Sequence, residues 1–145
     1  MSAFSDFEKP SRTNHKIKFL LPEGWKTPKG YSQGIVAEGR QIFISGQIGW
    51  DEAATFQTDD FAEKAGQALR NIMSILAEAN ANAEHITRMT WYITNKQEYL
   101  ASLKLLGQKY REEVGRHFPV MTVVEVKSLM EDRAKVEIEA TAVIP

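Results

Sequence analysis

The chain has 145 residues, of which 43% are hydrophobic and 26% are charged, a composition typical of one globular domain rather than of a disordered chain. Its 18 Lys and Arg side chains balance 19 Asp and Glu side chains, so the formal net charge of −1 provides no overall attraction to nucleic acid or to an anionic membrane. The absence of cysteine excludes a disulfide scaffold, a thiolate nucleophile and a cysteine-based zinc site.

The hydrophobic runs of the sequence are only a few residues long, whereas a membrane-spanning helix needs roughly 20 apolar residues in a row. The first residues are acidic and polar, where a secretory signal has a basic segment followed by an apolar one. We therefore expect a cytoplasmic protein that has neither a membrane nor a nucleic acid as its partner.

The first 30 residues contain many residues that interrupt helices and strands, namely Pro10, Pro22, Pro28, Gly24 and Gly30. Within this part only residues 17–21 suit a short extended segment. We expect residues 1–30 to form an irregular N-terminal tail and arm, of which residues 1–14 are the loose part. The folded domain is expected at residues 31–145.

From Tyr31 onward the pattern of apolar residues becomes regular. It predicts strands at 34–38 and 41–45, a helix at 59–79, a strand at 85–94, a helix at 96–114, and strands at 120–127 and 134–143. Gly39 and Arg40 separate the first two strands as a two-residue turn does, which predicts a hairpin. The order β-β-α-β-α-β-β indicates an α+β fold, in which two helices cover one face of a mixed sheet.

Side chains alternate between the two faces of a strand, so each predicted strand has a helix side and an opposite side. The helix side is expected to carry the apolar sets Met89, Trp91 and Ile93 on one strand and Val136, Ile138 and Ala140 on another. The opposite side then carries Arg88, Thr90 and Tyr92, together with Glu137, Glu139 and Thr141. Either contact with solvent or a wet interface between subunits explains this mixed polar and aromatic face.

Few residues could carry chemistry on their own. The histidines His15, His85 and His117 lack the spacing of a helical metal site, and the sequence has no phosphate-binding loop, nucleophile elbow or dinucleotide motif. We therefore expect no metal. Glu137 is a candidate general acid or base, provided that burial or the neighbouring charge of Glu139 tunes it. A solvent-exposed strand glutamate is the other interpretation of the same pattern.

Three segments of the sequence resemble the Rid family, which is also called the YjgF or L-PSP family. They are Tyr31-Ser32-Gln33-Gly34, then Ile42-Phe43-Ile44-Ser45-Gly46-Gln47-Ile48, and Val136-Glu137-Ile138-Glu139-Ala140. These segments stand in the family's order and at its separations. The resemblance covers residues 30–145 and implies a chorismate-mutase-like fold, assembled as a homotrimer with a cleft at each subunit interface.

Archetypal members of that family hydrolyse reactive imines and enamines and release ammonia, without a cofactor. In them an Arg in a P-x-R-S/T segment pairs with the substrate carboxylate. The matching segment here is Pro119-Val120-Met121-Thr122, so Met121 replaces that arginine. A thioether cannot pair with a carboxylate, and losing such an ion pair removes roughly 3 kcal/mol of binding, or about a hundredfold in affinity. We therefore expect weak activity on standard 2-imino acids, unless Arg88 or Arg116 supplies the cation.

The resemblance identifies Glu137 as the predicted catalytic residue. The predicted substrate-binding residues are Tyr31, Ser45, Gly46, Arg88, Tyr92, Met121 and Val123. The function expected first is cofactor-free hydrolysis of a small reactive imine or enamine. A non-catalytic small-molecule binder is the alternative. An endoribonuclease or translation inhibitor is a third interpretation, which the balanced charge disfavours.

Overall fold

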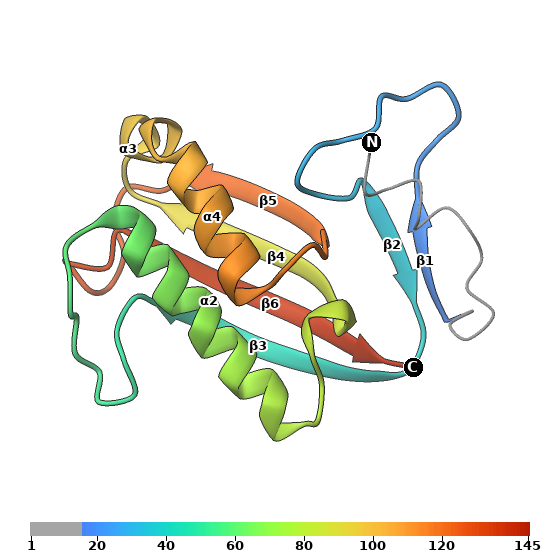
Figure 1. Ribbon diagram of the computed structural model, residues 1–145, viewed down its shortest axis with the longest axis horizontal. Helices are drawn as coiled ribbons and strands as arrows, with labels where there is room; N and C mark the ends of the chain where they lie inside the picture. The colour runs from blue at the N-terminus through green and yellow to red at the C-terminus, as the bar shows by residue number, and fades with distance from the viewer. Residues whose placement is uncertain (1–15) are drawn as a thin grey trace.

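The computed structural model describes residues 16–145 and has an α+β fold, as predicted. Its elements are β1 (Ile17–Leu20), β2 (Gly34–Ala37), β3 (Arg40–Ile48), α2 (Phe61–Glu78), the short 3-10 helix η1 (Ala83–His85), β4 (Ile86–Ile93), α3 (Lys96–Ala101), α4 (Leu103–Glu113), β5 (Val120–Glu125) and β6 (Val136–Ile144). Helices α2 and α4 lie side by side on one face of the main sheet (Figure 1). No helix in this described part of the chain is long and apolar enough to cross a membrane.

The main sheet has four strands in the order β3-β6-β4-β5. Strand β6 pairs antiparallel with both β3 and β4, whereas β4 and β5 run parallel. Parallel neighbours need a long crossover connection, which α3 and α4 provide between β4 and β5. The strand β5 therefore forms one edge of this sheet, beside the helical crossover (Figure 1).

The hydrophobic core lies between the main sheet and the two helices. Val136 and Ile138 of β6 are fully buried, and Glu137 between them is only partly covered. Leu69, Ile72 and Leu76 on α2 are fully buried against this face of the sheet. Burial of apolar surface at these positions therefore determines which face of each strand turns toward the helices.

The predicted hairpin between residues 34–38 and 41–45 is wrong. Strand β2 pairs antiparallel with β1 in a separate two-stranded sheet, and β3 pairs with β6. The chain bends at Gly39, which has a φ of 146°, and a Cβ there would lie 2.1 Å from the carbonyl oxygen of Ile144. Residues 17–20, which lie inside the predicted arm, thus form the strand that pairs with β2. The sequence predicted no pairing partner for these residues. The predicted loose tail, residues 1–14, and His15 lie outside the described residues.

The predicted helix at 96–114 is two helices rather than one. Helix α3 begins after Asn95, whose side chain accepts a hydrogen bond from the backbone N–H of Glu98 at 2.9 Å. The helix direction changes at Ser102, where the hydroxyl donates to the carbonyl oxygen of Glu98 at 2.7 Å and the backbone leaves helical angles. A serine that bonds back to the preceding turn is a known cause of such bends.

Strand β3 and helix α2 approach each other closely at Gly49. A Cβ at this position would lie 2.6 Å from the Cα atom of Lys64. Lys64 itself is fully buried: its ammonium donates to the backbone carbonyl of Arg133 and lies 4.6 Å from the centre of the Phe56 ring. Burial lowers the pKa of Lys64, while the nearby Asp59 carboxylate opposes that shift. The contact between helix and strand is therefore possible only without a side chain at residue 49.

We predict that Gly49→Ala destabilises the fold by about 2 kcal/mol, because the added methyl group overlaps backbone atoms of α2 that cannot move independently. Urea unfolding followed by circular dichroism measures the loss. The matched control is Gly66→Ala inside α2, where the methyl group meets only the flexible Lys109 side chain at 3.2 Å. Helix propensity favours alanine there, so this variant should stay within about 1 kcal/mol of the native protein. Equal stability of the two variants would contradict the close contact.

Candidate functional site

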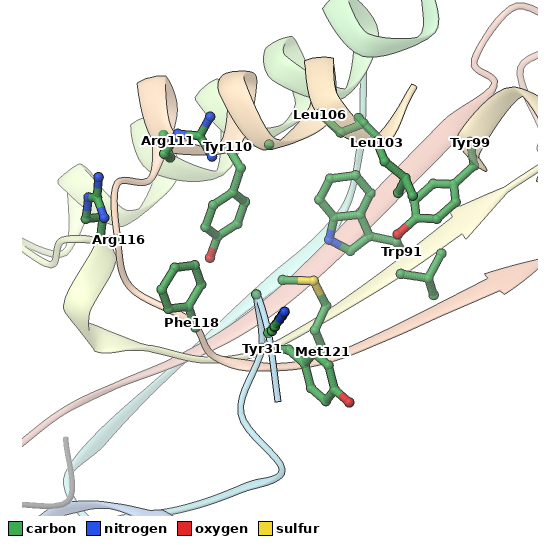
Figure 2. Close-up of a pocket in the computed structure, with 14 residues that line it drawn as sticks. Tyr31, Trp91, Tyr99, Leu103, Leu106, Tyr110, Arg111, Arg116, Phe118 and Met121 are labelled. Atoms are coloured by element: carbon green, nitrogen blue, oxygen red, sulfur yellow. The ribbon is translucent and has the colours of Figure 1, made fainter. Parts of the chain in front are cut away.

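Two hollows lie on opposite faces of the main sheet. The larger has a volume of about 650 Å³ and lies between the crossover helices, the β4–β5 edge and the segment 29–31 (Figure 2). Its walls come from Lys29, Gly30, Tyr31, Trp91, Tyr99, Leu103, Leu106, Gly107, Tyr110, Arg111, Arg116, Phe118, Met121 and Val123. We call this the helix-side cavity.

The helix-side cavity is mainly aromatic and aliphatic. The Tyr110 hydroxyl donates to the backbone carbonyl of His117 at 2.6 Å, and burial raises the pKa of both Tyr110 and Tyr99. The charged residues in its lining are all cationic, namely Lys29, Arg111 and Arg116, and no Asp or Glu is among the lining residues. The cavity can therefore enclose a small apolar molecule that carries negative charge, but it contains no carboxylate that could act as a base.

The second hollow has a volume of about 210 Å³ and lies on the face of the sheet that the helices do not cover. Its polar lining includes Arg88, Thr90 and Glu139. Tyr92 lies on the same strand face as Arg88, and its hydroxyl donates to Oε1 of Glu139 at 2.7 Å. This hydrogen bond is the largest cause of the raised pKa of Tyr92, and the charges of Glu139 and Glu137 raise it further. We call this surface of the sheet the open face.

Glu137 lies on the open face and packs directly against the backbone of Gly46. A Cβ on Gly46 would lie 2.6 Å from the carboxyl carbon of Glu137 and 2.8 Å from its Oε2 atom. The close contact coincides with an irregularity in the β3–β6 pairing between Ile44 and Gln47. Ser45 is exposed beside it, and the Gln47 side-chain amide donates to the Ser45 carbonyl oxygen at 3.2 Å. Glycine at residue 46 therefore allows the Glu137 carboxyl group to lie against the main chain.

The structure divides the predicted site residues between these two surfaces. Tyr31, Met121 and Val123 line the helix-side cavity. Gly46, Arg88, Tyr92 and Glu137 belong to the open face, with Ser45 beside Gly46. Within one chain the predicted residues are thus brought into two groups, separated by the thickness of the sheet.

The two arginines considered as replacements for the missing family arginine also lie on different faces. Arg116 shares the helix-side cavity with Met121, whereas Arg88 lines the hollow on the open face. Arg116 is therefore the one placed on the same side of the sheet as Met121.

Sequence reasoning did not identify Trp91, Tyr99, Tyr110 and Arg111 as cavity residues. The first three were expected in the core, because each occupies an apolar position of its strand or helix. The signal that could have revealed the cavity is the number of aromatic residues near β5. A single short edge strand cannot cover all of these side chains. Among residues 16–145 no group of acidic or histidine side chains is arranged to hold a metal ion.

We predict that Tyr92 titrates above the ordinary tyrosine value of about 10, because deprotonation breaks its bond to Glu139 and places a phenolate beside two carboxylates. Glu139→Gln should lower the pKa of Tyr92 more than Glu137→Gln does, since Glu137 acts only through its charge. Carbon-13 NMR of the tyrosine ring, assigned with Tyr92→Phe, measures the titration. An unchanged titration in Glu139→Gln would exclude the Glu139 carboxylate as its cause.

Comparison with known proteins agrees with the fold described above. A family model described as Endoribonuclease L-PSP matches residues 24–144. A RutC family protein from Aquifex aeolicus is 36% identical over 124 residues, which cover 81% of this chain and 96% of that protein. The human protein named 2-iminobutanoate/2-iminopropanoate deaminase is 29% identical over 114 residues, which cover 78% of this chain and 79% of that protein. The structure of E. coli TdcF with bound serine is similar with a TM-score of 0.64 and 28% identity, over 88% of this chain and 99% of that chain. The chain therefore belongs to the L-PSP family, which is also called the Rid or YjgF family.

Proposed function

We propose that the protein is a cofactor-free deaminase that hydrolyses a small imine or enamine to a carbonyl compound and ammonia. The observation that carries the proposal is the seating of the Glu137 carboxyl group against the Gly46 main chain on the open face. Relatives of this chain include proteins named as deaminases of 2-imino acids, which supports the same class of reaction. The proposed enzyme acts in the cytoplasm on a small molecule and needs no nucleic acid, membrane or metal as a partner.

Hydrolysis of an imine needs a water molecule held beside the C=N carbon and does not need a strongly acidic or basic side chain. Water adds to the C=N carbon and loses one proton, while the nitrogen gains one; the resulting amino alcohol then expels ammonia and forms the C=O bond. An enamine first takes a proton on carbon and becomes the imine. The Glu137 carboxylate is suited to accept the proton from water and to return it to the leaving nitrogen, which is general acid–base catalysis.

We further propose that each site is a cleft between two subunits of a homotrimer. A ligand that contacts Tyr31 and Met121 cannot reach Glu137 of the same chain, because the sheet lies between them. A second copy whose open face meets the helix-side cavity would bring the two groups of residues together, and closed rotational symmetry would repeat this contact around a ring. The open face also exposes Phe43 to 74%, a large apolar surface that an interface would cover.

A non-catalytic small-molecule binder is the second candidate. The observation in its favour is that the larger hollow contains cations and aromatic rings but no carboxylate. A protein that only binds would retain the helix-side cavity and lose nothing when Glu137 is replaced.

We predict that Glu137→Gln lowers the rate of ammonia release at least about a hundredfold, because the amide cannot accept a proton from water. The assay uses imines generated in situ, one set with a carboxylate and one without, and compares ammonia release with the spontaneous rate. Glu131→Gln, at an exposed carboxylate in the loop before β6, is the matched control and should keep full activity. Equal acceleration by the native protein and Glu137→Gln would exclude this role for Glu137, and no acceleration of any imine would favour the binder.

A further inference from the structure

We propose that the helix-side cavity selects a flat, cyclic carboxylate, with a hydrogen-bond acceptor that meets the Trp91 indole N–H and a negative charge that meets Arg111 and Arg116. This inference rests on the proposed function in one respect, namely that the ligand is the substrate or product of that reaction. Binding itself requires no reaction, so the two can be tested separately.

The first observation is an indole nitrogen without a partner. Trp91 is only 4% exposed, and its Nε1 atom is buried with no hydrogen-bond partner among the described residues. Indole N–H groups are donors only, and buried ones usually have an acceptor. Figure 2 shows the nitrogen on the side of the ring that faces Met121 and the interior of the cavity. An acceptor atom of a bound molecule would satisfy this donor.

The second observation is the shape of the cavity and the nature of its walls. A volume of about 650 Å³ lies within the range of small-molecule sites. Tyr110 and Phe118 stack nearly parallel, with an angle of 11° between their planes, and so form a flat surface at one side. Met121 lies between this surface and Trp91 in Figure 2, where its flexible thioether can adapt to a ring. Flat aromatic walls with an adaptable floor favour a planar cyclic group over a short aliphatic chain.

The third observation is the charge. Arg111 and Arg116 are exposed, and neither forms an ion pair with any carboxylate in residues 16–145. Figure 2 places both at the end of the cavity that is away from Trp91 and Tyr99. A guanidinium group can bind a carboxylate through two parallel hydrogen bonds. The ligand is therefore expected to carry its acceptor at one end and its carboxylate at the other, with the ring between them.

This arrangement gives Met121 a role different from that of the family arginine. The arginine of the P-x-R-S/T segment would grip a carboxylate beside the reacting carbon. In this chain Arg111 and Arg116 lie further along the cavity, and Met121 makes the position of the family arginine apolar. The chain therefore accepts a larger ligand whose charge is remote from Met121.

The binding test uses the full chain, nitrogen-15 NMR and the stable probe 4-acetylbenzoate. The three tryptophans give three indole N–H signals, and loss of one in Trp91→Phe assigns that of Trp91. We expect 4-acetylbenzoate to shift the Trp91 signal and to leave that of the exposed Trp25 unchanged. 4-Ethylbenzoate, which lacks the acceptor, should bind about fivefold more weakly, and 4-acetylbenzamide, which lacks the charge, about tenfold more weakly. Butanoate, which lacks the ring, should not bind.

Variants then separate the two ends of the ligand. Trp91→Phe should bind 4-acetylbenzoate and 4-ethylbenzoate equally, as measured by calorimetry, because the donor is absent. The double variant Arg111→Gln with Arg116→Gln should bind the acid and the amide equally, whereas the matched control Arg40→Gln, at the start of β3, should keep the native preference. An unmoved Trp91 signal, or equal binding of the acid and the amide by the native chain, would overturn the proposal.

The proposal and the function fail in different ways. Binding of 4-acetylbenzoate without any acceleration of ammonia release would support the cavity and exclude the deaminase. Faster ammonia release from aliphatic imines, with no binding of the aryl acid, would support the deaminase and overturn the assigned substrate class.

Discussion

Buried and partly covered residues alternate along β6, and this alternation determines which face of the main sheet each side chain occupies. Val136 and Ile138 must face the helices, because the core would otherwise lose the surface that packs against α2. Glu137 is then necessarily on the open face. The parallel register pairs Met89 with Met121 and Trp91 with Val123, so the same parity turns Met121 and Val123 toward the helices. One pattern of apolar burial therefore places the carboxylate and the aromatic cavity on opposite sides of the sheet.

This separation places the two groups of predicted site residues apart within each chain. The helix-side cavity encloses volume and gathers cations, but it offers no carboxylate. The open face offers Glu137 and Glu139, with Tyr92 bonded to one of them, but its hollow is small. In the proposed homotrimer, a site shared between subunits would join the two groups without any change of fold, since each copy would supply the group that its neighbour lacks. The exposure of Phe43 on the open face fits the same arrangement.

The sequence predicted those parts of the fold that depend on long, strongly periodic segments. Helix α2 and strands β4 and β6 lie close to where the periodicity placed them, and the resemblance to the Rid family led to the correct fold class. The hairpin prediction failed because a two-residue turn signal at Gly39 and Arg40 does not specify which strand β2 will pair with. The break at Ser102 depends on one side-chain hydrogen bond, which periodicity does not register. The burial of Lys64 depends on a carbonyl group 69 residues away in sequence.

The candidate site was less predictable than the fold for a related reason. The alternation of side chains along the strands correctly placed Arg88 and Tyr92 on the same face as Glu137. The apolar patterns of strand and helix, however, indicated that Trp91 and Tyr99 are ordinary core residues. Whether an aromatic residue fills the core or lines a cavity depends on what lies opposite, and β5 is an edge strand of the four-stranded sheet, contacted on its outer side by a bridge from Ser32 to Val120. That information comes from strand order, which the local pattern does not contain.

A subunit-mixing experiment can show whether the site is shared between two chains. Glu137→Gln removes the open-face half, and Tyr31→Ala damages the helix-side half, so each variant alone should be nearly inactive. If every site takes one half from each of two neighbours, a trimer that contains both variants has about one intact site in three. We predict that the two variants, co-expressed with different tags and purified through both, hydrolyse imines far faster than either alone. Activity no higher than the mean of the two variants would contradict a site built across the subunit interface.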